Sequence, residues 1–410
     1  MLFRNILKIL SGNIFGQLIN FVTFILISRE LGASKFGILS TILAVQFILI
    51  QASSFGISIS LPKLVSRDLS SLNDVYPWVL GFRVFCTVIS SIIGYLYIRE
   101  SIGNDISNEL LIASLCIASG SMFMFSQTIQ QSLGLYSGWA KANLALNFLK
   151  LVSIILLIYG FKILTLEYVL LIYFAIPLLV SVVIIVRIKK LNYSFNNSFS
   201  NFFSLIKASF WIFLSSMVVA ILMRLDVLML NHFLGTKEVG VYAVANQVAM
   251  VFALFTGAVN TVLLPEYKKL VQQMGAKNLR HSILKFTPIV FFIAGAFYVL
   301  SPYILILFGD GYTESAKPLA ILLVSYCFGM IVNPLSLTMY EANKSNILLY
   351  INVSQLIINF VSNLFLIPKF GILGAAMSAF SVRFFGAVCI ILLSKKYAEE
   401  IDKKVKNSET

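Results

Sequence analysis

Twelve stretches of about 20 apolar residues dominate the chain, and a helix of that length spans the hydrocarbon core of a bilayer. Eight of the twelve contain no charged residue. The pattern therefore predicts an all-α polytopic membrane protein with twelve transmembrane helices. The predicted spans are Ile9–Ser28, Ile38–Leu61, Val75–Ile98, Leu110–Leu133, Ala142–Gly160, Tyr168–Val186, Ala208–Asn231, Val239–Leu264, Phe286–Phe308, Pro318–Tyr340, Ser345–Ile367 and Phe370–Ser394.

The composition excludes a soluble globular protein. Of the 410 residues, 59% are apolar and 12% charged, with a mean hydropathy of +0.91, whereas a soluble domain carries about 25% charged residues. The net charge of +14 would suggest a nucleic-acid partner in a soluble protein. Here the basic residues follow the predicted topology: the cytoplasmic segments hold 20 of the 31 Lys and Arg, the outer segments 7 and the spans 4. This asymmetry predicts that both termini are cytoplasmic, and we expect no nucleic-acid partner.

The first span follows Arg4 and Lys8, as the apolar region of a signal peptide would. It is too long for one, contains polar amides and lacks a small-x-small cleavage site, so we interpret it as a retained first helix. No loop is long enough to fold around a core of its own, and the chain has no Gly-x4-Gly-Lys-Ser/Thr phosphate loop. The four cysteines lie in apolar helices without paired spacing, as small buried hydrophobes do. We therefore expect neither an enzyme nor a cofactor or metal site.

An internal repeat divides the chain into two halves. The segment Leu31-Gly32-Ala-Ser-Lys-Phe-Gly37 has a counterpart 203 residues later, Leu234-Gly235-Thr-Lys-Glu-Val-Gly240. A second pair is Phe161 to Leu164 and Phe370 to Leu373. The repeat predicts two six-helix lobes, residues 1–200 and 201–394, followed by a cytoplasmic tail, residues 395–410. Six is an even number, so we expect an axis along the membrane normal and a central cationic cavity where the lobes meet.

Polar stripes on several spans favour such a cavity. In the fifth span Asn143, Asn147 and Lys150 lie within about 60° of one another around the helix. The further stripes are Asn13, Gln17 and Asn20; Asn333, Ser336 and Tyr340; and Asn352, Gln355, Asn359 and Asn363. Each amide alone is equally well explained as interhelical glue worth about 0.6 to 2 kcal/mol. Taken together they favour a hydrated path, and we predict that Asn143, Asn147 and Asn359 contact substrate.

Five charged residues lie inside spans, where a charge usually marks function. Lys150 and Arg383 lie near mid-span, where a cation costs about 2.5 to 3.5 kcal/mol, so we predict that both face an anionic ligand or cavity water rather than a purely structural partner. Arg224 and Asp226 point about 200° apart and are expected to serve different neighbours. Arg224 is predicted to bind substrate, with snorkelling as the alternative, while Asp226 is either a structural counter-ion or a carboxylate that couples transport to an ion. Arg83 is close enough to one span end to snorkel to the headgroups.

Two prolines lie inside predicted spans. Pro177 and Pro334 each remove a backbone hydrogen bond and permit a kink. We consider both as hinge candidates, with a static kink as the alternative.

Three segments resemble a known family. They are Phe15 to Gly37; Met223-Arg224-Leu225-Asp226 with Val239-Gly240-Val241-Tyr242; and Leu366 to Ala376. Over nearly its whole length the chain is similar to bacterial polysaccharide exporters of the O-antigen flippase type, within the multidrug/oligosaccharidyl-lipid/polysaccharide exporter superfamily. The resemblance implies a two-lobed flippase of the bacterial inner membrane. Such a protein moves undecaprenyl-diphosphate-linked oligosaccharide repeat units, for O-antigen or a similar polysaccharide, from the cytoplasmic to the periplasmic leaflet by alternating access.

The resemblance also implies partners and alternatives. The partners are the lipid-linked glycan, membrane lipids, a coupling cation or proton, and a polysaccharide polymerase. Family members line the path with cations, a role that carries over onto Arg224; Asp226 is the clear candidate for ion coupling. One alternative, a multidrug extrusion antiporter of the same superfamily, should hold buried carboxylates, yet the spans hold four cations and one acid. The others are a polysaccharide polymerase or ligase, which generally has a large outer loop, and a non-transporting scaffold.

Overall fold

The protein is helical throughout the part that its computed structural model describes, namely residues 2–66, 70–103, 107–188, 199–251, 263, 267–342, 344 and 346–409. Within these ranges, ten helices are long and apolar enough to cross a membrane. The difference from the twelve predicted spans has two sources. The first of the ten, Phe15–Ser54, is 40 residues long and contains two predicted spans joined at the non-helical Gly32. The predicted span Val239–Leu264 includes residues 252–262, which lie outside the described ranges.

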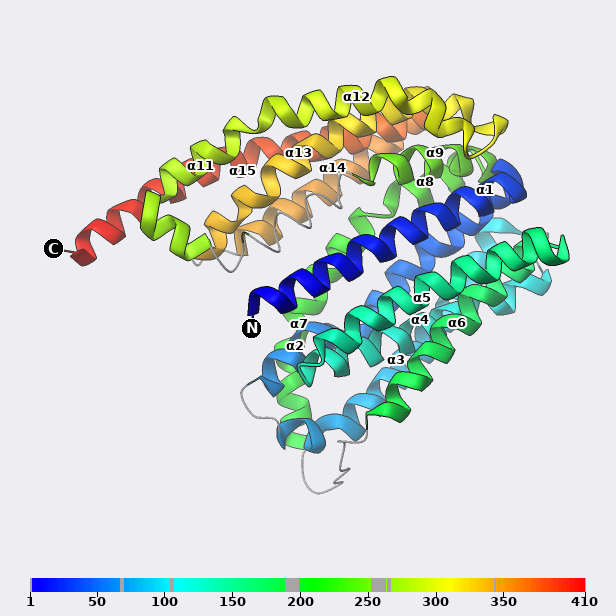
Figure 1. Cartoon of the computed structure of the whole chain (residues 1–410), viewed down its shortest axis with the longest axis horizontal. Helices are drawn as coiled ribbons and strands as arrows, with labels where there is room; N and C mark the ends of the chain where they lie inside the picture. The colour runs from blue at the N-terminus through cyan, green and yellow to red at the C-terminus, as the bar shows by residue number, and fades with distance from the viewer. Residues whose placement is uncertain are drawn as a thin grey trace. The chain divides into compact units, whose positions relative to one another are not determined.

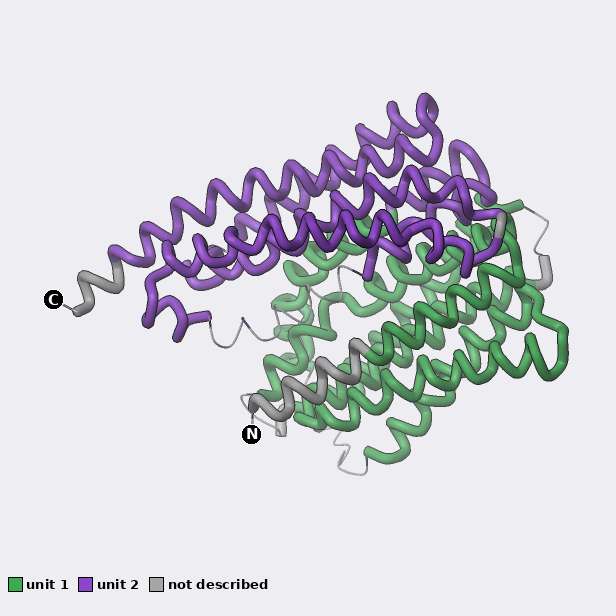
Figure 2. Tube along the Cα trace, turned by 45° about the horizontal axis from the view of Figure 1, so that its top comes forward, with its two compact units in different colours: residues 1–224 green, residues 225–410 purple. Residues whose placement is uncertain are grey.

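The chain forms two compact units, residues 1–224 and 225–410, which Figure 2 shows in green and purple. Unit 1 contains α1 (Leu2–Ser54), α2 (Ile57–Val65), α3 (Ser70–Ile102), α4 (Ser107–Ser132), α5 (Tyr136–Ile155), the π-helix η2 (Leu156–Phe161), α6 (Leu166–Arg187) and α7 (Phe199–Leu222). Unit 2 contains α8 (Leu225–Phe233), α9 (Thr236–Ala249), α11 (Ala276–Lys285), α12 (Thr287–Ile306), the 3₁₀-helix η3 (Asp310–Ser315), α13 (Ala316–Glu341), α14 (Asn346–Phe370) and α15 (Ile372–Glu409).

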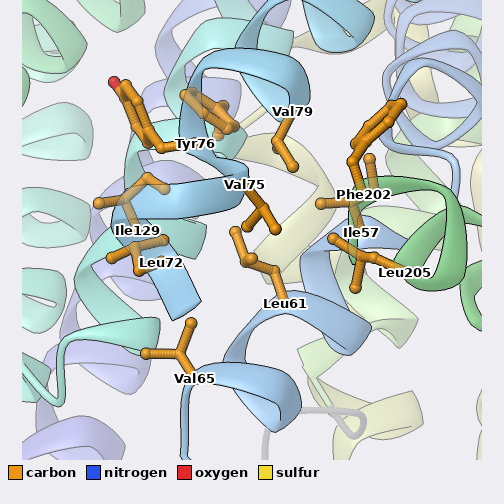
Figure 3. Packing of buried hydrophobic residues seen from close by; sticks show 11 residues of the cluster. Ile57, Leu61, Val65, Leu72, Val75, Tyr76, Val79, Ile129, Phe202 and Leu205 are labelled. Atoms are coloured by element: carbon orange, nitrogen blue, oxygen red, sulfur yellow. The ribbon is translucent and has the colours of Figure 1, made fainter. Parts of the chain in front are cut away.

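In unit 1, α1 packs against α3, α4 and α5, and α4 packs against α6 (Figure 1). The repeat assigns α7 to the second lobe, yet α7 groups with unit 1 because its first half packs on α2 and α3. Phe202 and Leu205 of α7 are buried in one hydrophobic cluster with Leu61 of α2 and Val75 and Val79 of α3 (Figure 3). Burial of such side chains contributes about 1.5 to 3 kcal/mol each.

A glycine between α1 and α2 permits the close approach of α7. The first helix ends at Phe55 and Gly56, and Gly56 has a φ of 73°. A Cβ atom at this position would lie 2.5 Å from the carbonyl oxygen of Ser209 and 2.8 Å from the amide nitrogen of Phe213. The hydroxyls of Ser60 and Ser209 form a hydrogen bond at the same contact. Gly56 is therefore required by both its conformation and its neighbours.

In unit 2, α13 and α14 both pack on α15, and α12 packs on α13. α15 is 38 residues long, so residues 395–409, predicted as a cytoplasmic tail, continue the last helix. This extension contributes Tyr397, Ala398 and Ile401 to buried clusters.

The backbone supports the internal repeat. Gly32 and Gly235, paired by sequence, have φ/ψ values of 72°/169° and 98°/−177°. Lys162 and Gly371, which occupy equivalent places in the second pair of segments, have φ values of 55° and 60°. In each matched pair, both residues thus have a positive φ, which is uncommon for a residue with a side chain.

Candidate functional site

The charged residues predicted inside the spans fall into separate groups, some in unit 1 and some in unit 2. Lys150, Arg224 and Arg83 belong to unit 1, whereas Asp226 and Arg383 belong to unit 2. Each group is described within its own unit.

Lys150 projects from α5 into the interior of unit 1. Its residue is 9% exposed, and its Nζ atom lies 3.9 Å from the ring centroid of Tyr173 on α6. The buried thiol of Cys116 on α4 is its electrostatic neighbour. Among the described residues, Lys150 has neither a hydrogen bond nor an ion pair. Its charge is therefore compensated by an aromatic face and remains available to an anion that reaches it.

Asn147 of the same stripe faces a different helix. Nδ2 of Asn147 donates a 2.9 Å hydrogen bond to the backbone carbonyl of Asn143. A Cβ atom at Gly16 of α1 would lie 3.1 Å from this Nδ2. The predicted stripe therefore splits, because the Asn147 amide faces α1 whereas Lys150 contacts α6.

Arg224 follows α7 directly, in the turn that ends unit 1. Its guanidinium carbon lies 4.7 Å from the ring centroid of Phe47 on α1, and the side chain is half-buried. The arginine therefore retains partial access to the surroundings of unit 1.

Arg83 does not snorkel, so that expectation is wrong. The residue is 4% exposed, and its Nη2 donates a 2.9 Å hydrogen bond to the carbonyl of Ser121. The Ser121 hydroxyl in turn bonds those of Ser53 and Thr87. α3 directs the side chain toward α4, where the Ser121 carbonyl accepts a charge-assisted hydrogen bond from the guanidinium.

In unit 2, Asp226 is the centre of a polar cluster. Its Oδ1 accepts a 2.8 Å hydrogen bond from Nδ2 of Asn363 on α14, and its Oδ2 accepts a 3.1 Å bond from the hydroxyl of Tyr242 on α9. Asn363 also donates to Oδ1 of Asn359. The carbonyl of Asn359 accepts a bond from Ser378 of α15. Four elements thus position one carboxylate.

Arg383 of α15 belongs to the same region of unit 2. Its Nη1 donates a 3.0 Å hydrogen bond to Oγ of Ser325, and its guanidinium carbon lies 4.2 Å from the ring centroid of Tyr326. The hydroxyl of Tyr326 donates a 3.0 Å bond to Oδ1 of Asn246. Arg383 also interacts electrostatically with Asp226, so the cation and the carboxylate are linked. The Arg383 side chain is half-buried, and an anion approaching it would find donors already oriented.

The cluster around Asp226 contains carboxylate and amide oxygens, the ligand types that a small hard cation takes. Oδ1 of Asn363 is buried and has no hydrogen-bond partner, and it belongs to the amide whose Nδ2 contacts Asp226. Carboxylate and amide oxygens are the ligands that alkali and alkaline-earth ions prefer. Asp226, Asn359 and Asn363 are therefore the residues that could hold a coupling ion, and Asp226 alone could hold a proton.

The polar stripe of the eleventh predicted span lies on the inner side of α14. Asn359 and Asn363 are buried, and Nε2 of Gln355 donates a 3.0 Å bond to the carbonyl of Val382 on α15. These residues bond to α8 and α15, and a hydrated path along them stays a prediction. The stripe of the tenth span differs, since Asn333 and Tyr340 are exposed.

The proline candidates lie in uninterrupted helices. Pro177 is buried in α6, and Pro334 is buried in α13. The interruptions of the apolar runs occur instead at Phe55–Gly56 and at Met223–Arg224. Hinge motion at either proline stays a prediction.

The sequence patterns missed the aromatic partners of the charges. Tyr173, Tyr242 and Tyr326 each contact a charged or polar group, yet a hydropathy pattern counts tyrosine with the apolar residues. Tyr242 had one signal, because it lies in the Val-Gly-Val-Tyr segment that follows Arg-x-Asp.

A cavity of about 490 Å³ lies in unit 2, between the ends of α9, α13, α14 and α15. Lys237, Glu238 and Phe370 are among the residues that line it. It contains no predicted site residue.

Sequence comparison relates the chain to glycan export. The model of the family described as "Polysaccharide biosynthesis protein" matches residues 2–271. A probable low-salt glycan biosynthesis flippase of Haloferax volcanii, Agl15, is 24% identical over 396 residues, which cover 92% of this chain and 79% of that protein.

Structural comparison establishes the fold. The lipid II flippase MurJ in an inward closed conformation superimposes with a TM-score of 0.75 at 15% identity, over 96% of this chain and 90% of MurJ. A multidrug resistance transporter of the MATE family, in its inward-facing conformation, has a TM-score of 0.75 at 15% identity, over 95% and 96% of the two chains. The prediction of a two-lobed helical membrane fold is confirmed by these likenesses.

Proposed function

The chain belongs to the polysaccharide biosynthesis protein family, and from that premise we propose that it is a flippase for undecaprenyl-diphosphate-linked oligosaccharide repeat units, moving them from the cytoplasmic to the periplasmic leaflet. The observation that supports this proposal most directly is the polar cluster of unit 2, where Arg383 presents an oriented guanidinium within an apolar helix. A guanidinium forms strong, charge-assisted hydrogen bonds with phosphate.

The physical problem of the reaction explains why such a group is needed. Moving a bare glycan through hydrocarbon would cost roughly 2 to 7 kcal/mol for each hydroxyl that loses its water. A polar route lowers this cost while the polyprenyl tail stays in the bilayer. In this proposal Arg383 and Arg224, both half-buried, bind the diphosphate. Asn143, Asn147 and Asn359 contact the sugar-phosphate region.

Lys150 has a more demanding role in this proposal. Its ammonium lies under the Tyr173 ring within unit 1, so the side chain has to leave this ring before it contacts a diphosphate. The exchange of a ring for a phosphate replaces a cation–π contact of about 2 kcal/mol with a charge-assisted hydrogen bond.

We propose that Asp226 couples transport to a cation or proton. The Asp226 carboxylate and the Arg383 guanidinium attract each other. Neutralising one charge therefore changes the affinity of the other group for its own ligand, a cation at Asp226 or an anion at Arg383. An anion bound to Arg383 strengthens the attraction of a cation to Asp226, and linkage requires the reverse effect to be equal. An inside-negative potential also favours outward movement of the anionic lipid by about 2.3 kcal/mol per charge per 100 mV.

The experiment for the function is deletion of the gene, followed by location of the lipid-linked oligosaccharide. We expect the oligosaccharide to accumulate on the cytoplasmic leaflet, with surface polysaccharide restored by the wild-type gene. Unchanged surface polysaccharide in the deletion strain would refute the proposal. A drug-sensitive strain with normal polysaccharide would instead favour the multidrug alternative.

A further inference from the structure

Unit 2 carries a compact helical surface to which the proposed function assigns no role. We call it the basic platform and define it as residues 267–274, α11 and residues 391–403 of α15. Tyr267, Val271, Leu279, Ala398 and Ile401 are buried together in one hydrophobic cluster that joins the three segments. Figure 1 shows α11 beside the C-terminal part of α15. The platform is therefore a folded structure rather than a set of loose loops.

Side-chain hydrogen bonds fasten α11 to α15 at two levels. The Asp402 carboxylate accepts hydrogen bonds from the backbone amides of Ala276, at 2.7 Å, and Lys277, at 3.1 Å. This caps the first turn of α11 from a distant part of the chain. One turn later, Nε of Arg280 donates to Oγ of Ser394 at 3.1 Å, and its Nη2 donates to the carbonyl of Ile391 at 3.3 Å. The orientation of α11 is thus fixed.

The fixed orientation presents positive charge on one face. Ala276 and Leu279 are buried in the cluster, whereas Lys277, His281 and Lys285 are exposed. Positions separated by four residues lie about 40° apart on a helix, so these three form one stripe. The platform contains eight Lys and Arg against three Asp and Glu, and Lys268, Lys395, Lys396 and Lys403 are also exposed.

The neighbouring residues indicate what faces this charge. Lys285 is followed at once by Phe286, which is 61% exposed, and by α12, on which Ile289 is 53% and Phe292 78% exposed. Exposed apolar side chains on a membrane-spanning helix face lipid tails. The stripe therefore ends where hydrocarbon begins, at the depth of the lipid headgroups.

We infer that the basic platform binds the anionic phospholipid headgroups of the cytoplasmic leaflet. The bases are distributed over two helices and a neighbouring helical segment, a layout that fits several headgroups of a surface rather than one diphosphate. Juxtamembrane lysines gain affinity from the negative potential of such a leaflet. The platform would hold α11 and the end of α15 against the membrane. This inference does not depend on the substrate that unit 2 transports.

The test is a lipid titration of the detergent-purified full chain, followed by native mass spectrometry with phosphatidylglycerol and, separately, phosphatidylcholine. We expect K277Q/K285Q/K396Q to weaken phosphatidylglycerol binding at least tenfold, because each lysine near an anionic surface contributes about fivefold. The matched control, K237Q/K317Q/K369Q, removes three exposed lysines from the other end of unit 2 and should bind as the wild type does. Equal weakening in both triple variants, or none in either, would overturn the inference.

Further variants and a second lipid distinguish binding by the basic platform from non-specific charge attraction and from binding of the polyprenyl diphosphate carrier. Asp402→Ala removes a negative charge, so non-specific attraction would strengthen phosphatidylglycerol binding, whereas loss of the fixed platform should weaken it. K277R/K285R/K396R keeps the charge and should bind normally. If K277Q/K285Q/K396Q weakens binding of a short-chain polyprenyl diphosphate but not of phosphatidylglycerol, the platform belongs to the carrier and our assignment is wrong.

Discussion

At the scale of single residues, the two units compensate their intramembrane cations in different ways. Lys150 has an aromatic ring as its contact. Arg383 has a hydroxyl, a ring and the attraction of Asp226. Depth along a span and formal charge are readable from sequence, and they led to both residues. Their partners Tyr173 and Tyr326 could not be predicted, because a hydropathy pattern counts tyrosine with the apolar residues and does not show which residues lie beside a charge.

Replacing Lys150 with Met tests whether this cation serves transport or structure. A buried charge replaced by an apolar side chain of similar length leaves stability unchanged or raises it. We therefore expect Lys150→Met to lose export while its melting temperature in detergent stays at or above that of the wild type. Lys141→Met, an exposed lysine on the same helix, is the control. Wild-type export by Lys150→Met would remove this residue from the substrate path.

Replacing Asp226 with Asn tests the coupling site. An amide at this position removes the charge and places its NH₂ against that of Asn363 or the hydroxyl of Tyr242, which should cost about 1 to 3 kcal/mol of stability. In vesicles with an imposed cation or proton gradient, we expect transport by Asp226→Asn to lose its dependence on the gradient. Glu238→Gln provides a charge-matched control. Gradient dependence equal to the wild type would exclude Asp226 from coupling.

At the scale of elements, the sequence predicted where helices begin and end better than where they break. Apolar runs and the repeat located the spans, and both repeat glycines adopt the positive φ expected at a helix junction. The break at Phe55–Gly56 was not predictable, because Gly56 is fixed by contact with Ser209 and Phe213, far along the chain. The prediction that Arg83 snorkels was wrong for a similar reason, because its hydrogen-bond partner Ser121 lies on another helix.

The pair Lys162 and Gly371 yields a stability prediction at this scale. Both end a helix in the left-handed region, where a side chain costs about 1 to 2 kcal/mol. Lys162→Gly should therefore raise the free energy of unfolding by up to about 1 kcal/mol, and Gly371→Ala should lower it by a similar amount. A Cβ at Gly371 meets its nearest neighbour, Leu234, at an ordinary 3.9 Å, so backbone strain is the only term. Thermal unfolding in detergent measures both changes, and a change of the same sign in the two variants would contradict the equivalence.

At the scale of the whole molecule, the fold was predictable and the grouping of α7 was not. Hydropathy and the repeat gave an all-helical membrane protein in two lobes, and the likeness to two solved transporters agrees. The repeat treats the first and seventh spans as equivalents. The grouping of α7 with unit 1 depends on Phe202 and Leu205 meeting the cluster of α2 and α3, a tertiary contact that no local pattern records.

The function proposed for the whole molecule joins these scales. A chain of the polysaccharide biosynthesis family holds an oriented arginine, a carboxylate linked to it and a polar cluster, all inside apolar helices. If Arg383 binds the diphosphate, its loss should remove charge-assisted hydrogen bonds worth about 1.5 to 3 kcal/mol, which corresponds to a rate lower by about tenfold to a hundredfold.

The most direct measurement uses the purified chain in liposomes that contain undecaprenyl-diphosphate-linked oligosaccharide, with a membrane-impermeant glycosidase to report which leaflet holds the glycan. Our account predicts that wild-type protein makes the inner-leaflet glycan accessible faster than protein-free liposomes do. Arg383→Lys should retain part of this rate, and Arg383→Met should lower it by about tenfold to a hundredfold. Protein-free and protein-containing liposomes with equal rates would contradict the account, as would an Arg383→Met variant as fast as the wild type.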